Sequence, residues 1–408
     1  MNGTLRTYLR YTSWPIIAAM ITLMVWGVLA IRVSEQSDPS MAGFANRQTI
    51  YACIAILAFM AATVVPYQRV GEMAYMLFAV TLTMLMVVLF LPGRGGARRW
   101  IFLGPIQVQP SELTKLTYIT MLAWYLRYRD NYRRLVGLTL PFILTLVPLG
   151  LILVEPDLGT SLLFLPTLYV MLFMAGAKLR HLLGIVAVAT AVVLMPVPVK
   201  LPASAARPAL TYGIVSLGGQ RYALRAVSLA AMAPHQVGRI EGWLNQGSLS
   251  DLDKGYQLAQ SKMIMGSGRL TGGADWDEGE VCFQMLPEDH TDFIFSVVGG
   301  RWGFLGCIGV LALYGVIFLF GAEIAVITDD PFGRLLSVGV LALLCAQIAI
   351  NTGMAIGLMP VTGMTLPLVS YGGSSLVANC AALGLLVNVG QRRPLLLGPK
   401  PFEYGDSE

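Results

Sequence analysis

Charged residues are scarce in this sequence. Only 12% of its 408 residues are Asp, Glu, Lys or Arg, which is half of the roughly 25% found in soluble globular domains. Hydrophobic residues make up 56%, and the mean hydropathy is +0.67. This composition excludes an ordinary soluble domain. It predicts a multi-pass membrane protein, because several apolar runs reach the roughly 18 residues that a spanning helix requires.

Cysteine and histidine are rare as well. Four of the 5 cysteines lie in apolar runs, and Cys282 stands alone in a polar stretch. Neither a disulfide framework nor a metal-ligand spacing is therefore indicated. The net charge of +5 comes mainly from arginines in short loops. These arginines are explained by the orientation of the protein in the membrane. We therefore expect no nucleic-acid partner.

The apolar runs predict ten transmembrane helices. They cover residues 14–31, 49–65, 73–91, 110–126, 135–153, 160–177, 182–199, 304–324, 335–354 and 374–389. We therefore predict an all-α polytopic membrane protein that forms a single membrane domain over residues 1–408.

Basic residues in the short loops predict the orientation. Arg6, Arg69, Lys178, Arg334 and the arginine cluster at 127–134 share one side, which the positive-inside rule assigns to the cytoplasm. Both termini, including a short polar tail at 394–408, are then cytoplasmic. The large loop between the seventh and eighth spans, about residues 200–303, is extracytoplasmic.

The first part of this loop is less acidic than the second. Arg221 and Arg225 would share one face of a helix there. Such a segment is either an amphipathic linker or a helix that lies on the membrane surface.

Carboxylates are concentrated in the second part of the loop, at residues 243–303. They are Asp251, Asp253, Asp275, Asp277, Glu278, Glu280, Glu288, Asp289 and Asp292. His290, one of 3 histidines in the chain, lies among them. A membrane protein that gathers its carboxylates in one extracytoplasmic loop is expected to carry out its chemistry or recognition there.

Charged residues also occur on the outer side near residue 100. Arg98 and Arg99 run against the positive-inside trend. Binding an anionic headgroup or a diphosphate would explain them, and nonspecific contact with lipid phosphates would do so equally well. Glu112 and Lys115 lie three residues apart on one helix face, so the simplest account is that they pair with each other.

Two further outer segments are rich in turn-forming residues. In the short turn at 155–160, Pro156 would end one helix and Asp157 would cap the next; a metal or substrate role is the second interpretation. Glycine-rich stretches at 357–363 and 370–375 predict non-helical backbone at membrane depth. Because hydrocarbon cannot satisfy its amides, we expect a re-entrant segment packed beside a site.

Together these motifs resemble the SEDS family (shape, elongation, division and sporulation), which includes RodA, FtsW and SpoVE. The matching segments follow the family order along nearly the whole chain: QPSE at 109–112, EPDLGT at 155–160, GYQ at 255–257, LPEDHTDFIF at 286–295 and LPLVSYGGSS at 366–375. The resemblance implies a multi-pass protein of the bacterial cytoplasmic (inner) membrane. It implies a peptidoglycan glycosyltransferase that polymerises lipid II, the undecaprenyl-pyrophosphate-linked disaccharide pentapeptide, at the outer face.

The resemblance also implies a partner and a biological role. A class B penicillin-binding protein is the expected transpeptidase partner, alongside membrane lipids. The stretch Gln260-Ser261-Lys262 and the short N-terminal segment resemble RodA more than FtsW, which favours a function in cell elongation.

In the reaction that the resemblance implies, an α-linked diphosphate leaves and a β-linked glycan forms, so the configuration inverts. A carboxylate base near the acceptor hydroxyl is the usual requirement. Asp251 is the nearest match to the family's catalytic aspartate, and Asp253 is its rival, because the expected proline and first glycine after the aspartate are missing here. Cations must hold the departing diphosphate, either basic side chains or a divalent ion such as Mg²⁺ or Mn²⁺.

Other residues receive their expected roles from the same resemblance. The candidate diphosphate ligands are Arg99, Lys115, Lys262 and Arg269. The residues expected to shape the site are Glu112, Glu155, Asp157, Gln260, Ser261, His290, Thr291, Asp292, Ser370, Gly372, Gly373 and Ser374. Helix capping and loop pinning would explain His290 and Asp292 equally well.

Three alternative functions stay open at this point: a division-specific FtsW-like polymerase, a lipid flippase, and a noncatalytic scaffold for a penicillin-binding protein. A flippase would usually show internal repeats, and none is evident in this sequence. The altered surroundings of Asp251 keep the scaffold open.

Overall fold

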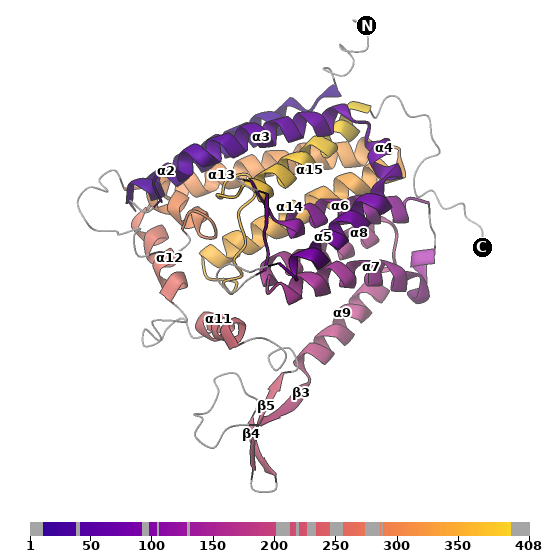
Figure 1. The fold of residues 1–408 in the computed structure, drawn as a ribbon, viewed down its shortest axis with the longest axis vertical. Coiled ribbons are helices and arrows are strands. Elements are labelled where there is room, and N and C mark those ends of the chain that lie inside the picture. The colour runs from indigo at the N-terminus through magenta and orange to yellow at the C-terminus, as the bar shows by residue number, and fades with distance from the viewer. Residues whose placement is uncertain are drawn as a thin grey trace, which may run out of the picture.

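The computed structural model describes residues 11–37, 41–91, 98–103, 106–128, 131–200, 213–217, 220–226, 234–244, 256–273, 286 and 289–392. Helices dominate it, and most of them run side by side in one bundle (Figure 1). They are α2 (Trp14–Ser37), α3 (Phe44–Val64), α4 (Tyr67–Glu72), α5 (Ala74–Val88), α6 (Pro110–Leu126), the 3-10 helix η2 (Asn131–Arg133), α7 (Leu135–Val154), α8 (Leu158–Met174), α9 (Leu179–Leu194), α11 (Pro234–Leu244), α12 (Tyr256–Ser267), α13 (Ile294–Ile327), α14 (Pro331–Ala355) and α15 (Gly373–Arg392).

Many of these helices have the length and polarity of membrane spans. Within the described ranges, 6 helices are long and apolar enough to cross a bilayer, namely α2, α3, α7, α13, α14 and α15. Three shorter apolar helices, α5, α8 and α9, accompany them. Many large apolar side chains on their outer faces are exposed, as lipid-facing residues must be. The chain is a multi-pass membrane protein.

Small residues and one asparagine join α3 to α15. A Cβ on Gly384 would lie 2.7 Å from the carbonyl oxygen of Phe59, so only glycine permits this close crossing. One turn further along α15, the buried Asn388 donates from Nδ2 to the Ala62 carbonyl at 2.7 Å. At the same end of the bundle, Gln391 Nε2 donates to Thr12 Oγ1 at 2.9 Å. The first and last described helices therefore meet on one side (Figure 1).

Helix α13 contains a break that hydropathy does not reveal. Gly303 has a φ of 65° inside the helix, where it separates a buried first section from a second section that carries the lipid-facing residues. The predicted span at 304–324 corresponds to the second section. The backbone of Gly303 packs against Leu270 and Gly272, because a Cβ there would lie 2.3 Å from the Gly272 nitrogen. A positive φ at so crowded a position requires glycine.

The structure is mostly helical, as predicted, but two small sheets correct the prediction of an all-α fold. Strands β1 (Ile101–Leu103) and β2 (Ile106–Val108) form an antiparallel hairpin. Strands β3 (Pro196–Lys200), β4 (Gly213–Leu217) and β5 (Gln220–Ala226) form a second antiparallel sheet in the order β3-β5-β4. Arg221 and Arg225 lie in β5 and not on a helix face. Figure 1 shows α9 leading away from the bundle to this sheet.

The seventh predicted span, 182–199, is too long because its last residues form strand β3. Helix α9 ends at Leu194 and the chain enters β3 at Pro196. Pro196 and Pro198 lack the amide hydrogen that a helix needs. Val197 and Val199 between them favour extended backbone. An edge strand tolerates both prolines, and β3 is an edge of its sheet.

The segment between α14 and α15, residues 356–372, has neither helix nor strand. Much of it is nevertheless buried, including Val361, Met364, Leu366 and Val369. The prediction of non-helical backbone packed inside the protein is therefore confirmed. We call residues 356–372 the α14–α15 loop.

Candidate functional site

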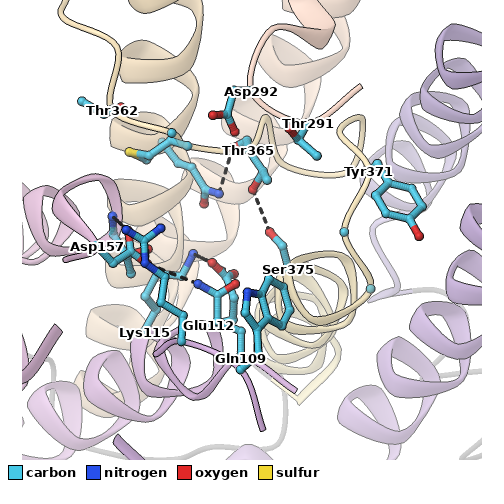
Figure 2. Close-up of a pocket in the computed structure, with 18 of the residues that line it drawn as sticks. Gln109, Glu112, Lys115, Asp157, Thr291, Asp292, Thr362, Thr365, Tyr371 and Ser375 are labelled. Carbon is cyan, nitrogen blue, oxygen red and sulfur yellow. Dashed lines mark hydrogen bonds and ion pairs between the residues drawn. The ribbon is translucent and has the colours of Figure 1, made fainter. Parts of the chain in front are cut away.

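A polar cavity of about 820 Å³ lies at the end of the bundle opposite the Thr12–Gln391 contact. Its wall comes from α3, the stretch before β1, β2, the start of α6, the α7–α8 turn, α8, α11, residues 290–292, α14, the α14–α15 loop and the start of α15. Figure 2 shows many of the lining side chains. The lining residues are Tyr51, Arg99, Trp100, Gln107, Gln109, Glu112, Lys115, Pro156, Asp157, Thr160, Leu163, Arg239, His290, Thr291, Asp292, Gln347, Thr362, Gly363, Met364, Thr365, Tyr371, Gly372, Gly373 and Ser375.

A buried ion pair lies in this wall. Pro110 begins α6, so Glu112 falls in the first turn, where the helix dipole favours a negative charge. Lys115 Nζ lies 2.9 Å from Glu112 Oε1 and 2.8 Å from Oε2. Both side chains are almost fully buried, at 3% and 6% exposure. The predicted pairing of these residues is confirmed, and the pair points into the cavity rather than into lipid.

The α7–α8 turn contributes the second polar part of the wall. Asp157 caps α8: its Oδ1 accepts from the Thr160 amide at 3.2 Å, and its Oδ2 accepts from Thr160 Oγ1 at 2.9 Å. Gln109 Nε2, from the start of α6, donates to the same Oδ2 at 3.2 Å. The predicted capping role is confirmed. It also fixes the distance between the α6 and α8 ends of the cavity.

Arg99 joins the stretch before β1 to the same turn. Its Nε donates to the Glu155 carbonyl at 3.0 Å, and its Nη2 donates to the Pro156 carbonyl. Both acceptors are neutral carbonyls, so these two hydrogen bonds do not neutralise the positive charge of the guanidinium. It lines the cavity, where an anion could reach it.

The carboxyl group of Glu155 lies behind this turn. It is fully buried, and neither of its oxygens accepts a hydrogen bond from the part of the chain that the structure describes. Burial raises the pKa of Glu155 to about 8, with a further rise from Asp157 that Arg99 partly offsets. Glu155 is therefore largely protonated at neutral pH.

Gln48 holds the end of the α14–α15 loop in place. From α3, its Nε2 donates to the Ser370 carbonyl at 3.1 Å, and its Oε1 accepts from the Gly372 amide at 3.3 Å. Ser370 Oγ donates to the Thr291 carbonyl and accepts from the Leu366 amide at 2.7 Å. The loop is thereby tied both to the bundle and to residues 290–292.

Main-chain groups of residues 290–292 complete this wall. The His290 carbonyl accepts from the Tyr371 amide at 2.9 Å, and the Asp292 carbonyl accepts from Asn351 Nδ2 at 2.8 Å. The His290 ring packs edge-on against Phe44. Loop pinning thus accounts for the backbone here, while the side chains of Thr291 and Asp292 line the cavity (Figure 2).

Glycines and a serine at the start of α15 face the hairpin. Gly372 and Gly373 line the cavity, and a Cβ on Gly373 would lie 3.0 Å from the Tyr51 ring. Ser374 Oγ donates to the Gln107 carbonyl at 3.0 Å and accepts from the Gln109 amide at 3.2 Å. Ser374 therefore positions the β2–α6 connection.

Other predicted site residues either fall outside the described residues or lie away from the cavity. Asp251 and Asp253 lie outside the described residues. Lys262 lies on α12 and Arg269 follows that helix; both are exposed, and neither lines the cavity. Their assignment as diphosphate ligands stays a prediction.

The two other α12 residues also lie away from the cavity. Gln260 is half-buried and does not line it. Ser261 is fully buried: its Oγ lies 2.6 Å from Ser296 Oγ on α13 and donates to the Ala355 carbonyl at 2.7 Å. It fixes α12, the helix that follows the Asp251 segment, against α13 and α14.

Sequence reasoning missed Arg239, Gln347 and Tyr51. Gln347 lies inside a predicted span, and an uncharged polar side chain at such depth was the signal that could have found it. Its Nε2 donates to the Thr365 carbonyl at 3.1 Å. No local pattern could have shown that α11, which carries Arg239, folds back over the cavity.

No group of three His, Cys, Asp or Glu side chains that could hold a metal ion occurs among the described residues. The cavity wall instead supplies fixed cations, hydrogen-bond donors and carboxylates. Such a wall suits a ligand that combines an anionic group with many hydroxyl or amide groups.

Comparison with known proteins places this geometry in a family. The family of cell cycle proteins named after FtsW, RodA and SpoVE matches residues 8–394. Stage V sporulation protein E of Bacillus subtilis is 32% identical over 93% of this chain and 97% of its own. Peptidoglycan glycosyltransferase RodA of Treponema pallidum is 31% identical over 85% of this chain and 89% of its own. A probable peptidoglycan glycosyltransferase FtsW of Trichlorobacter lovleyi is 33% identical over 90% and 88%.

A solved structure is also similar. The structure named "Structural coordination of polymerization and crosslinking by a peptidoglycan synthase complex" contains a chain that is 30% identical. It superposes with a TM-score of 0.73 over 94% of this chain and 98% of the other. The similarity therefore covers the whole bundle and not only the motifs.

Proposed function

The chain belongs to the SEDS family of FtsW, RodA and SpoVE proteins, and we propose that it is a peptidoglycan glycosyltransferase of the bacterial cytoplasmic membrane. Its substrate in this proposal is lipid II, which it polymerises into glycan strands at the outer face. Relatives that carry the name peptidoglycan glycosyltransferase support the reaction class.

The observation that carries the proposal is the cavity with its buried Glu112–Lys115 pair and adjacent Arg99. Two cations in one wall suit the diphosphate of a lipid-linked sugar. The carboxylates and amides of Asp157, Gln109 and Gln347 suit the sugar hydroxyl and acetamido groups. The position of the cavity at the helix ends lets the lipid tail stay among the apolar faces while the head group enters the protein.

The chemistry needs a base, a leaving-group site and alignment. An acceptor hydroxyl attacks the anomeric carbon as the bond to the diphosphate oxygen breaks, and the hydroxyl proton passes to a carboxylate. We assign that carboxylate to Asp251, with Asp253 as the rival. Their segment precedes α12, which the Ser261 hydroxyl fixes to α13 and α14. A positioned base of this kind contributes about 10²–10⁴ in rate.

We assign the negative charge of the leaving diphosphate to Lys115 and Arg99. Lys262 and Arg269 are weaker candidates because they do not line the cavity. A divalent ion, Mg²⁺ or Mn²⁺, is an alternative source of positive charge. The carboxylates of Glu112 and Asp157 in the wall are of the type that Mg²⁺ prefers, and water and phosphate oxygens usually supply its remaining ligands.

We also propose ten membrane spans with both termini in the cytoplasm, and one membrane domain over residues 1–408 with its large outer loop at about 200–303. The 6 long apolar helices, the 3 shorter ones and α6 support this number. The contact between Thr12 and Gln391 supports termini on the same side.

For the biological role, we propose RodA-like cell elongation, with an FtsW-like division role as the alternative. The stretch Gln260-Ser261-Lys262 favours RodA, whereas identities of 31% to a RodA and 33% to an FtsW do not separate the two. Rescue of rod shape in bacteria depleted of their own elongation polymerase, without rescue of a division-polymerase depletion, is the expected result. The reverse pattern would reassign the role.

We further propose a class B penicillin-binding protein as partner. The similarity to a chain from a peptidoglycan synthase complex of polymerisation and crosslinking supports it. Crosslinking in cells followed by purification in detergent should recover a single-span protein with an outer transpeptidase domain. Recovery of no such protein would count against the partnership.

Purified protein incubated with labelled lipid II tests the main proposal. Polymerisation yields glycan strands on a gel. Lipid transfer across a vesicle bilayer without strands would identify a flippase. If neither strands nor lipid transfer were observed, the noncatalytic scaffold would be the remaining function.

A further inference from the structure

Arg239 lines the cavity but lies outside the sequence motifs from which the site was predicted. It lies on α11, which comes from the large outer loop, and it shares the cavity with Arg99 and Lys115. Its side chain is exposed, so a ligand can reach it. The two basic residues predicted from the same loop, Lys262 and Arg269, do not line the cavity.

Helix α11 is docked on the α14–α15 loop by two side chains one turn apart. Trp243 Nε1 donates to the Gly357 carbonyl at 3.0 Å, and Arg239 Nη1 lies 3.5 Å from the Val361 carbonyl. Residues four apart share one helix face. Trp243 therefore fixes the helix, and Arg239 reaches the cavity from the preceding turn.

The positive charge of Arg239 has fewer partners than the charges of Lys115 and Arg99, the two other basic side chains discussed above. Lys115 is paired with Glu112, and Arg99 donates to two carbonyls. Within the part of the chain that the structure describes, Arg239 makes one long contact to a neutral carbonyl. The Asp292 carboxylate lies in the same part of the cavity wall: Asp292 Oδ2 and Arg239 Nη1 would lie 3.4 and 3.8 Å from a Cβ on Gly363.

Arg99 and Arg239 contact different parts of the cavity wall. Arg99 is held by the α7–α8 turn and Arg239 by the α14–α15 loop. A guanidinium offers several donors in one plane and binds phosphate oxygens in pairs. A diphosphate carries more negative charge than the carboxylate of Asp292, so it can compete with that carboxylate for the Arg239 guanidinium in the cavity wall.

We infer that Arg239 of α11 is a binding residue for the diphosphate group of the lipid-linked substrate, so that the outer loop closes the cavity with a cation. This inference rests on the proposed function, since that function supplies the diphosphate. If Arg239 served only to pin α11, removing its charge would loosen the helix without changing the affinity for diphosphate.

Titration of the purified full-length protein in detergent with farnesyl diphosphate tests the inference. Arg239→Met should weaken binding by at least about tenfold. Arg239→Lys should fall between Arg239→Met and wild type, because lysine keeps the charge but loses paired donation. Arg301→Met is the matched control: Arg301 Nη1 also contacts a single carbonyl, that of Gly273 at 3.4 Å, but it does not line the cavity. That control should bind like wild type.

The possible results separate this inference from the proposed function. Wild-type affinity in Arg239→Met overturns the inference, as does a wild-type protein that does not bind farnesyl diphosphate. If Arg239→Met fails to fold, wild-type affinity in Arg239→Lys overturns it equally. Diphosphate binding that depends on Arg239, in a protein that makes no glycan from lipid II, would support the inference while the proposed function fails.

Discussion

Lys115 Nζ lies 2.8 Å from Glu112 Oε2, and both side chains are almost completely removed from solvent. Removing one partner of such a pair leaves an uncompensated buried charge, which costs about 3–5 kcal/mol. We therefore expect Lys115→Met to unfold at clearly lower denaturant or temperature than wild type. The double variant Glu112→Gln/Lys115→Met should recover part of the loss.

A double-mutant cycle measured by unfolding in detergent checks this expectation. Strong coupling between the two sites is the predicted outcome. Effects that add to within about 0.5 kcal/mol would show that the two charges do not depend on each other.

Gln48 provides a second test, because it clamps the backbone that lines the cavity. Gln48→Leu removes both bonds, to the Ser370 carbonyl and from the Gly372 amide. The α14–α15 loop should then shift, and the KM for lipid II should rise or kcat should fall several-fold. Gln391→Leu is the control, since Gln391 makes its bond to Thr12 at the other end of the bundle. Equal kinetic effects of the two variants would contradict the positioning role.

The raised pKa of Glu155 leads us to expect that the stability of the protein depends on pH. Its pKa is raised from 4.5 to about 8 in the folded protein. The folded state therefore binds more protons than the unfolded state between these values, and the free energy of unfolding falls as the pH rises through this window. Glu155→Gln cannot ionise, so its advantage over wild type should grow from pH 5 to pH 8.

Unfolding midpoints of both proteins across that range provide the measurement. Glu72→Gln, which changes an exposed carboxylate on α4, should keep the wild-type slope. A constant difference between Glu155→Gln and wild type at every pH would show that Glu155 does not titrate in this window.

The orientation can be tested by labelling single cysteines in a cysteine-free background. Leu270 follows α12 on the side of the cavity, and Tyr128 follows α6 on the opposite side; both are exposed. In intact cells an impermeant thiol reagent should label Leu270→Cys, whereas Tyr128→Cys should react only after permeabilisation. Labelling of Tyr128→Cys alone would invert the topology.

The sequence predicted the parts of the fold that depend on short-range patterns. Hydropathy found the apolar helices because the composition of each apolar run is itself the signal. The Glu112–Lys115 pair and the Asp157 cap were predictable because their partners lie three residues apart. The non-helical backbone of the α14–α15 loop was also predictable, because its glycines and turn-forming residues act on the backbone at their own positions.

The rest of the site is assembled over long distances in the chain. Ser374 meets Gln107 and Gln109, and Gln48 meets Ser370, across hundreds of residues. No periodicity encodes such contacts. The proline-containing strand β3 was read as the end of a span because its valines are as apolar as those of a helix. Tertiary pairing with β5 decided its structure.

The rate of glycan strand formation from labelled lipid II, measured for purified wild type, Asp251→Asn and Asp253→Asn side by side, tests the central claim most directly. We predict strands from wild type, a loss of about 10²–10⁴-fold in Asp251→Asn with lipid II binding retained, and a much smaller loss in Asp253→Asn. A dead Asp253→Asn beside an active Asp251→Asn would move the base by two residues. Absence of strands from wild type, or wild-type rates in both variants, would contradict the account.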